Sequence, residues 1–330
     1  MSRFAALVVR EREGEYVQEV EERTVDDLPE GEVLVRVQYS SLNYKDALSA
    51  TGHKGVTRNY PHTPGIDAVG VVEESSSELF GSGDAVLVTG YDLGMGTAGG
   101  YGQYIRVPAA WVVPLPVGLS ALESMIYGTA GFTAALSVLK LQEGGVGPGE
   151  GEVLVTGATG GVGSTAVSIL ARAGYRVVAA TGKMEEAEFL VGLGAGEVVA
   201  REEIADADGR PMLKERWAGV VDSVGGDMLA TAIKATRADG VVTCCGLVAA
   251  AELATTVYPF ILRGISLVGI NSVDCAMDLR REVWRRLAGE WKADNLDSLS
   301  RLCRLAELPA EIERILQGKQ RGRVVVDLQG

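Results

Sequence analysis

The sequence contains few of the residues that hold metal sites and disulfides together. Its 330 residues include four cysteines and two histidines, and the first cysteine is Cys244. A tetrahedral zinc site in the first part of the chain would lack its usual ligands, and a four-cysteine cluster would lack the paired spacing. We therefore expect no metal. Unpaired thiols are typical of a reducing compartment, so we expect a cytoplasmic location.

Positive charge is also scarce. The chain has 31 lysines and arginines against 44 aspartates and glutamates, a net charge of −13 with both signs scattered. Nucleic acids and anionic membranes need a dense basic face, so we expect neither as a partner. A small anionic ligand remains possible, because a helix N-terminus or a few local cations can hold one.

Long hydrophobic runs are missing too. No apolar run approaches the 18 or so residues of a membrane span, and the first residues show no signal-peptide pattern. What the chain has in quantity is glycine, 43 residues spread along its length. This distribution predicts tight turns and ligand-binding loops. The length predicts about two domains.

The order of the predicted elements indicates an α/β fold. Short apolar runs separated by turns predict a mostly β first part, with strands at 5–9, 33–39, 68–73 and 85–89. Strands then alternate with helices: strands at 152–157, 176–181, 197–200, 219–224, 241–246 and 266–270, and helices at 161–173 and 184–193. This alternation predicts a doubly wound parallel sheet covered on both faces. Helices at 278–291 and 310–317 follow, and we expect the closing strand 323–328 to pair with the β-rich first part.

A glycine-dense turn after the strand at 152–157 predicts a phosphate-binding loop. In the G-x-G-x-x-G frame, Gly160 and Gly163 fill the second and third positions and Ala158 replaces the first glycine. Gly160 would let the backbone approach a pyrophosphate, and Gly163 would let the helix pack on the strand. The alternative is a glycine-rich connection without a ligand. The same residues also match the glycine-rich loop of short-chain dehydrogenases. That family has a Tyr-x-x-x-Lys pair, which is absent here, because none of the ten tyrosines is followed by a lysine four residues later.

The end of the next predicted strand indicates which dinucleotide is bound. An NAD site usually has Asp or Glu about 20 residues after the glycines, whereas this chain has Thr181, Gly182 and Lys183. Lys183, together with Arg201 at the end of the following strand, could bond a 2′-phosphate. We therefore expect NADPH, with ordinary solvated cations as the alternative.

Taken together, these motifs resemble the zinc-independent quinone oxidoreductase branch of the medium-chain dehydrogenases/reductases, and within it the NADPH-dependent acryloyl-CoA reductase group. The likeness spans essentially the whole chain. The segments that carry it are 40–48 (SSLNYKDAL), 64–67, 128–134, the phosphate loop, 217–226 (WAGVVDSVGG) and 259–264. The segment 90–99 departs from the group by lacking tryptophans, and residues 248–250 replace a glycine pair. Both lie where a substrate pocket could be shaped.

The resemblance implies an architecture and a set of site residues. It implies a GroES-like catalytic domain at 1–122 and 273–330, a Rossmann NADPH-binding domain at 123–272, and commonly a homodimer. Residues Asn43, Tyr44 and Asp46 match the active-site segment, with Asp46 orienting its neighbours. The residues that match cofactor contacts are Tyr44, Thr159, Gly160, Gly161, Val162, Thr181, Gly182, Lys183, Arg201, Leu247, Ile270, Ser272 and Arg323. The alternative for Asn43 and Asp46 is that they only cap a helix beginning near Tyr44.

The resemblance also implies a reaction, in which hydride from NADPH reaches the β-carbon of an α,β-unsaturated thioester and a proton reaches the α-carbon. Negative charge then builds on the thioester oxygen, which calls for preorganised donors such as the Tyr44 hydroxyl, the Asn43 amide or the cofactor ribose hydroxyl. Either Tyr44 or water could give the proton. The expected substrate is a small molecule, with acryloyl-CoA first. A quinone or enone reductase is the second reading, and the net charge of −13 favours it because a CoA nucleotide would want a basic patch. A third reading is an NADPH-binding protein without turnover.

Overall fold

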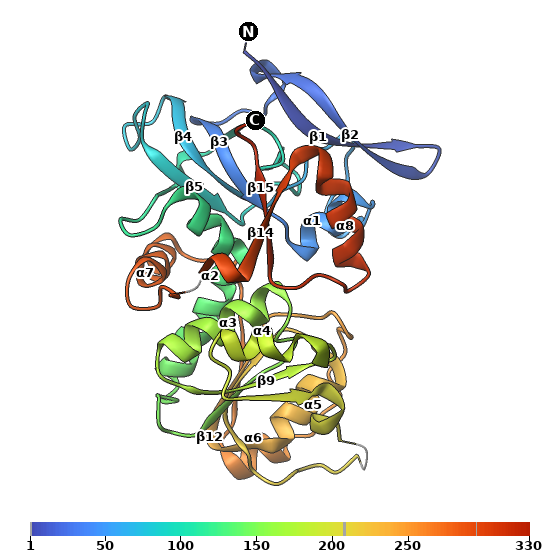
Figure 1. Ribbon diagram of the computed structural model, residues 1–330, viewed down its shortest axis with the longest axis vertical. Coiled ribbons are helices and arrows are strands. Elements are labelled where there is room, and N and C mark those ends of the chain that lie inside the picture. Colours follow the sequence, from blue (N-terminus) through green and yellow to red (C-terminus); the bar gives the residue numbers. More distant parts are fainter. Residues whose placement is uncertain (1, 207–208, 295) are drawn as a thin grey trace. The chain divides into compact units, whose positions relative to one another are not determined.

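The computed structural model describes residues 2–206, 209–294 and 296–330, and it divides into two compact units. The first unit comprises residues 1–129, 273–288 and 296–330, and the second comprises residues 130–272 and 289–295. The division therefore falls at 129/130, 272/273, 288/289 and 295/296, whereas the prediction from the sequence was 122/123 and 272/273. Figure 1 shows the elements of both units.

The first unit is built on a seven-stranded sheet with the strand order β14-β15-β3-β4-β5-β7, to which β6 adds by pairing with β3. Its strands are β3 (Val33–Ser41), β4 (Asp67–Ser75), β5 (Ala85–Thr89), β6 (Tyr104–Val107), β7 (Val113–Pro114), β14 (Ser300–Arg304) and β15 (Arg323–Asp327). The closing strand β15 lies between β14 and β3, which confirms the expected pairing with the β-rich part. The alternating valines of β3, together with Ala68 and Val72 of β4, belong to a core that also includes Leu42, Tyr101 and Ile105.

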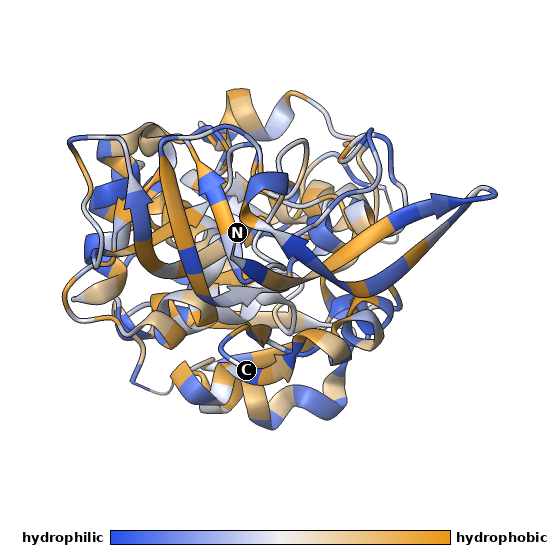
Figure 2. Cartoon of the chain, turned by 90° about the horizontal axis from the view of Figure 1, so that it is seen from above, coloured by the Kyte–Doolittle hydropathy of each residue, from blue (hydrophilic) through white to orange (hydrophobic). Residues whose placement is uncertain are grey.

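A long hairpin of β1 (Arg3–Arg12) and β2 (Glu15–Thr24) forms a separate two-stranded sheet in the same unit. The buried middle of β1 is hydrogen-bonded to the rest of the unit. The Leu7 amide donates to the Tyr101 carbonyl oxygen, and the Val9 amide donates to the His62 carbonyl oxygen. The tip is exposed and hydrophilic, as Figure 2 shows. Sequence analysis found the apolar part of β1 but missed β2, whose residues are mostly polar.

Short helices complete the first unit. The α-helices are α1 (Tyr44–Ala50), α7 (Met277–Ala288) and α8 (Leu308–Leu316). The 3-10 turns are η1 (Val25–Asp27), η2 (Ala109–Trp111), η5 (Leu296–Leu299) and η6 (Leu305–Glu307). The prediction of a helix at 278–291 was too long, because α7 ends at Ala288, just before Gly289.

The second unit is a six-stranded parallel sheet with the order β10-β9-β8-β11-β12-β13. Its strands are β8 (Glu152–Val155), β9 (Arg176–Thr181), β10 (Glu197–Ala200), β11 (Trp217–Asp222), β12 (Thr236–Cys244) and β13 (Ser266–Gly269). In chain order this is 3-2-1-4-5-6, the arrangement of dinucleotide-binding sheets with a switch point between the first and fourth strands. The predicted doubly wound parallel sheet is therefore confirmed.

The helices of the second unit are α3 (Gly161–Arg172), α4 (Ala187–Gly192), α5 (Gly226–Ala235) and α6 (Tyr258–Arg263), with the 3-10 turns η3 (Met184–Glu186) and η4 (Arg201–Ile204). The helix predicted at 184–193 is thus a 3-10 turn followed by six α-helical residues. Apolar side chains of β8, β9, β11 and β12 form one cluster with Leu229 and Ile233 of α5.

Helix α2 (Ala121–Glu143) begins in the first unit and ends in the second. It is long and apolar enough to cross a membrane by length and composition, but 83% of its most apolar window is buried inside the protein. The helix is also interrupted at Gly128, whose φ of 51° and ψ of −156° are not helical. These features are those of a core helix.

Candidate active site

The carboxyl ends of the six parallel strands form one edge of the second unit. The loops that leave this edge carry the phosphate loop after β8, Thr181–Lys183 at the end of β9, and Arg201 after β10. Leu247 follows β12, and Ile270 and Ser272 follow β13. In open α/β sheets, ligands bind at this edge next to the switch point.

The phosphate loop has the backbone geometry that close approach of a ligand requires. Gly163 packs tightly, because a Cβ there would lie 2.3 Å from the Gly157 carbonyl oxygen. Gly160 is the N-cap of α3, and a Cβ there would meet only the Gly157 oxygen, at 3.3 Å. The positive φ of the turn, 60°, belongs to Gly157 rather than to Ala158, which the sequence frame put in the first glycine position. Gly161 and Val162 open the first turn of the 12-residue helix α3.

The ends of β8, β9 and β10 are brought together by side chains from the predicted set. The hydroxyls of Thr159 and Thr181 lie 3.2 Å apart, and the Lys183 amide donates to the Thr181 hydroxyl at 3.0 Å. The Arg201 guanidinium lies over Gly182, where a Cβ would be 3.0 Å from both Cζ and Nε of the arginine. Burial lowers the pKa of Lys183, while the charges of Glu186 and Glu185 raise it.

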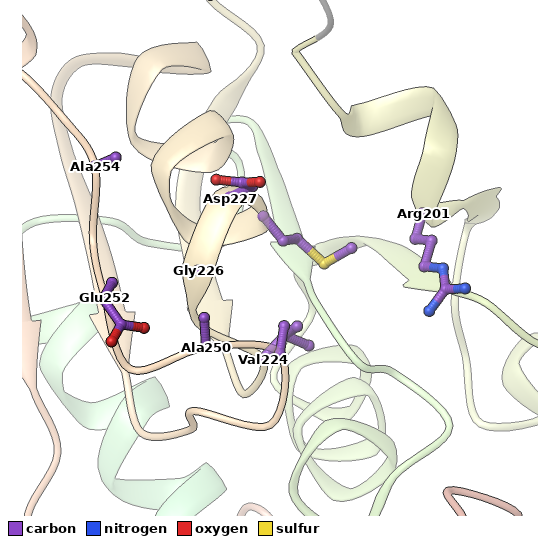
Figure 3. A pocket seen from close by; sticks show the side chains of 9 residues that line it. Arg201, Val224, Gly226, Asp227, Ala250, Glu252 and Ala254 are labelled. Carbon is purple, nitrogen blue, oxygen red and sulfur yellow. The ribbon is translucent and has the colours of Figure 1, made fainter.

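Arg201 also borders a pocket of about 270 Å³ in the second unit. The other lining residues are Val224, Gly226, Asp227, Met228, Ala249, Ala250, Glu252 and Ala254. Arg201 opens η4, Val224 precedes α5, Gly226, Asp227 and Met228 begin α5, and the other residues lie in the segment between β12 and α6 (Figure 3). The segment 248–250, expected near a substrate pocket, thus contributes two residues to the same cavity as Arg201.

The remaining predicted contacts of the second unit lie further along the edge. Leu247 is 66% exposed. The Ile270 amide donates to the Cys244 carbonyl at 3.0 Å, which fixes the chain after β13. The Ser272 hydroxyl accepts a hydrogen bond from the Thr133 hydroxyl at 2.9 Å.

In the first unit, Asn43, Tyr44 and Asp46 lie at the start of α1. Asn43 is the N-cap, and its backbone amide donates to Asp46 Oδ2 at 2.8 Å. Tyr44 is the first helical residue and is 40% exposed, whereas Asn43 and Asp46 are buried. The capping geometry that the sequence left as an alternative is therefore present.

Asp46 is held in a buried cluster of donors. Its Oδ1 accepts from the Ile66 amide at 2.8 Å, and its Oδ2 accepts from the Tyr101 hydroxyl at 3.0 Å and the Asn43 side chain at 3.2 Å. Burial and then the negative charge of Asp67 raise the pKa of Asp46 to about 7. The buried carboxyl of Asp46 therefore holds its proton more tightly than an exposed aspartate does.

Asp67 is a member of this cluster that sequence reasoning missed. It is fully buried and accepts hydrogen bonds from the hydroxyls of Ser41 and Thr129, from the Thr129 amide, and from Asn43 Nδ2 at 2.8 Å. Gly128 lies against it, since a Cβ there would fall 2.5 Å from Asp67 Oδ2. The available signal was a charged residue at the start of an apolar strand, which points to a buried partner.

Arg323 belongs to the same cluster. Only 1% of it is exposed, and it forms an ion pair with Asp67 across 3.9 Å. It donates to the carbonyls of Ile126 and Leu42, to the Ser41 hydroxyl and to Asn43 Oδ1. The structure thus places this predicted cofactor contact inside the first unit, in contact with Asn43.

The two histidines lie in loops. His62 is buried, and its Nε2 is 2.9 Å from the Gly94 carbonyl oxygen. His53 is exposed. Across residues 2–206, 209–294 and 296–330, no group of three His, Cys, Asp or Glu side chains is arranged to hold a metal ion.

Comparisons with known proteins agree with this architecture. Residues 29–117 match the alcohol dehydrogenase GroES-like domain, and residues 161–289 match the zinc-binding dehydrogenase domain. The predicted GroES-like and Rossmann fold class is therefore confirmed.

Similar proteins cover the whole chain. A Bacillus subtilis protein named "Putative quinone oxidoreductase YhfP" is 46% identical, with 98% of this chain and 99% of that protein aligned. Its solved structure, with NAD bound, gives a TM-score of 0.97 and covers 99% of this chain and all of that one.

Two further relatives are comparably similar. The "Acrylyl-CoA reductase AcuI" of Ruegeria pomeroyi is 47% identical, with 98% of this chain and 99% of that protein aligned. The structure of YhdH from Escherichia coli K-12 with bound NADPH is 42% identical, covers 98% of this chain and all of that one, and has a TM-score of 0.95. The chain therefore belongs to the zinc-independent quinone oxidoreductase branch of the medium-chain dehydrogenases/reductases.

Proposed function

We propose that the protein is an NADPH-dependent reductase that reduces the activated carbon-carbon double bond of an α,β-unsaturated acyl thioester, with acryloyl-CoA converted to propanoyl-CoA. The observation that carries the proposal is the end of β9 and β10, where the Arg201 guanidinium, which also pairs with Glu202 at 2.9 Å, lies over Gly182 and Lys183 follows. An acidic residue here would repel a 2′-phosphate, and this chain has a hydroxyl, a glycine and a cation instead. The 47% identity to an acrylyl-CoA reductase supports the thioester substrate.

The residues of the second unit fit the dinucleotide. The open side of Gly160 and the N-terminus of α3 suit a diphosphate, which the helix dipole and backbone amides favour. The pocket beside Arg201 suits the adenosine end, with apolar Val224 and Met228 for the base. The solved NADPH complex of the relative YhdH supports the same cofactor.

The first unit supplies the groups for the substrate. When bound, NADPH supplies the hydride that adds to the β-carbon of the thioester. Negative charge then builds on the thioester oxygen, so a preorganised donor lowers the barrier. We assign this role, and delivery of the proton, to the exposed Tyr44 hydroxyl. Asn43 and Asp46 are positioning residues, because the Asn43 amide hydrogens already bond the carboxylates of Asp46 and Asp67.

A quinone or enone reductase is the second candidate. The 46% identity to YhfP supports it. The net charge of −13 favours it as well, since a CoA nucleotide carries phosphates that the overall field repels. Both candidates use the same cofactor and the same donor.

Turnover assays separate the candidates. Purified protein is mixed with NADPH and either acryloyl-CoA, crotonyl-CoA or 1,4-naphthoquinone, and absorbance at the nicotinamide band is followed. Faster oxidation with acryloyl-CoA, judged by kcat/KM, supports the thioester reductase, and faster oxidation with the quinone supports the alternative. NADPH binding without oxidation by any of them would favour a protein that only binds the cofactor. Tyr44→Phe should lower kcat by about 100-fold, within the range of a lost general acid.

The nucleotide preference has its own test. Lys183→Glu should raise the KM for NADPH strongly and leave the KM for NADH little changed, because only NADPH carries the 2′-phosphate. Lys214→Glu is the matched control, an exposed lysine on the segment before β11. Equal effects of Lys183→Glu on both nucleotides would contradict the assignment.

We also propose that two copies associate through the edge of the six-stranded sheet. Strand β13 is the last strand in the order and pairs only with β12 among the described residues. Beside it, Ile261 and Leu262 of α6 are 69% and 65% exposed, and Leu267 of β13 is 37% exposed. An unpaired edge next to exposed apolar side chains favours association. Leu267→Lys should convert the dimer to a monomer in sedimentation velocity, and a wild-type monomer would refute the proposal.

A cytoplasmic location is proposed from the thiols. None of the four cysteines forms a disulfide among the described residues, and Cys275 and Cys303 are buried. Burial raises the pKa of both Cys245 and Cys303 to about 12, so these thiols stay protonated and react slowly with oxidants. Cell fractionation with activity measured in each fraction tests the location.

A further inference from the structure

Asp222, the last residue of β11, is a buried carboxylate without a counter-charge. It is 0% exposed, and the side-chain contacts of Asp222 among the described residues are all with uncharged donors. Its partners are three hydrogen-bond donors. Oδ1 accepts from the Thr156 hydroxyl at 2.7 Å, and Oδ2 accepts from the amides of Val224 at 3.3 Å and Gly225 at 2.9 Å. Burying an ionisable group costs free energy unless its lone pairs accept hydrogen bonds. For Asp222, these hydrogen bonds come from the loops that follow β8 and β11.

Thr156, the residue after β8, is hydrogen-bonded to both Asp222 and Ser223, and we call this group of three residues the junction. The Thr156 hydroxyl donates to Asp222 and accepts from the Ser223 amide at 3.1 Å, so the direction of its single proton is fixed. The Ser223 hydroxyl in turn donates to the Thr156 carbonyl oxygen at 2.9 Å. Three hydrogen bonds therefore connect Thr156, the residue before the phosphate loop, with Asp222 at the end of β11 and with Ser223 directly after it.

The two loops joined in this way border different parts of the dinucleotide site. Thr156 directly precedes Gly157, where a Cβ would lie 2.7 Å from the Ser223 hydroxyl, so the loops are already in close contact. Val224 and Gly226 line the pocket that Arg201 borders (Figure 3). A shift at the junction would change the distance between the phosphate loop and this pocket.

We propose that Asp222 and Thr156 are positioning residues for the dinucleotide: their hydrogen bonds hold the phosphate loop and the loop after β11 at one spacing across the switch point of the sheet. This inference rests on the proposed function, since it presumes that a dinucleotide spans both loops. Neither side chain needs to touch the cofactor. Their role is to fix the backbone that does.

A neighbouring threonine provides a matched control. Thr243 of β12 is also 0% exposed, and its hydroxyl donates to the Val220 carbonyl at 3.0 Å within the same sheet. This bond involves neither of the two loops. Valine has the shape of threonine without the hydroxyl, so Thr156→Val and Thr243→Val each delete a buried hydroxyl and keep its volume.

Calorimetric titration of the full-length protein with NADPH is the test. Thr156→Val should raise the Kd by about tenfold or more, because Asp222 and the Ser223 amide lose a partner at the junction. Thr156→Ser, which keeps the hydroxyl, should stay within about twofold of wild type, and so should Thr243→Val. The melting temperature of each variant is measured as well, and NADPH binding is compared at a temperature where all variants are folded, which separates loss of stability from loss of positioning. In turnover assays, the change should fall on the KM for NADPH rather than on kcat.

The outcomes distinguish failure of the positioning role from failure of the proposed function. Equal affinities of Thr156→Val and Thr243→Val would overturn the positioning role while leaving NADPH binding intact. Wild-type protein that gives no heat with NADPH would instead overturn the proposed function, and the inference with it. If Thr156→Val does not fold, Ser223→Ala is used instead, because it removes one hydrogen bond of the junction. It should raise the Kd for NADPH by about threefold, less than the tenfold expected for Thr156→Val. An unchanged Kd in that variant would refute the role.

Discussion

The protein should become more stable as the pH falls from 8 to 5, through the carboxyl group of Asp46. Asp46 is fully buried, and burial together with the charge of Asp67 raises its pKa from 3.8 to about 7. In the unfolded chain the group ionises near its ordinary value. Between pH 4 and 7, the folded state therefore binds a proton that the unfolded state has lost, and the free energy of unfolding falls as the pH rises.

The size of the effect follows from the shift. One pKa unit corresponds to about 1.4 kcal/mol, so the interval from pH 5 to the folded pKa near 7 corresponds to about 2–3 kcal/mol. For a chain of 330 residues, that is a change of about 3–4 °C in melting temperature.

The measurement has to separate Asp46 from other groups that titrate in the same range. Burial lowers the pKa of His62, so His62 contributes stability that is lost as the pH falls below about 6.5, the opposite trend. Comparing wild type with Asp46→Asn cancels the histidine, which both proteins retain. The stability difference between the two should shift by about 2–3 kcal/mol in favour of wild type on going from pH 8 to pH 5. A difference that stays constant over this range would refute the reasoning.

Three further predictions concern the glycines and the arginine that shape the two sites. Gly163→Ala should lower stability by about 1–3 kcal/mol and weaken NADPH binding in calorimetry, because its Cβ would press on the Gly157 oxygen; Gly147→Ala, with open space around it, is the control and should do neither. Gly128→Ala should cost about 3 kcal/mol or more in urea unfolding, because it combines a positive φ with contacts to three polar atoms, and a cost below 1 kcal/mol would contradict this account. Arg323→Met should cost about 3–5 kcal/mol in the same assay, since it removes the buried cation, and an unchanged midpoint would show that the cation is not needed.

Local patterns were enough to predict the second unit. The continuous apolar strand at Val153–Val155 and the glycines that follow it are a local signal, so both the parallel sheet and the tight packing of Gly163 could be predicted. The strand order then brings the carboxyl ends of β9 and β10 together, which is why Gly182 and Arg201 meet. Boundaries were less accurate, as at β11, which begins at Trp217 rather than at Gly219.

The cluster in the first unit could not be predicted in the same way. Asp67 and Arg323 meet because β15 pairs with β3 while β4 pairs with the other side of β3. Those pairings join segments from opposite ends of the chain, and neither periodicity nor motif spacing encodes which side chains they bring into contact. The resemblance pointed to Arg323 as a cofactor contact, whereas the structure shows what it touches: Asp67, Asn43 and backbone carbonyls.

The charges of this cluster explain how the first turn of α1 is oriented. Two carboxylates face one guanidinium, and Asn43 lies between them, with its Nδ2 donating to Asp46 and Asp67 and its Oδ1 accepting from Arg323. An amide placed between acceptors on one side and a cation on the other has a single favourable orientation. Because Asn43 is the N-cap of α1, that orientation also sets where the helix begins. Tyr44, the next residue, therefore projects from a turn that buried electrostatics hold in place, and this is the preorganisation that a donor for a developing negative charge requires.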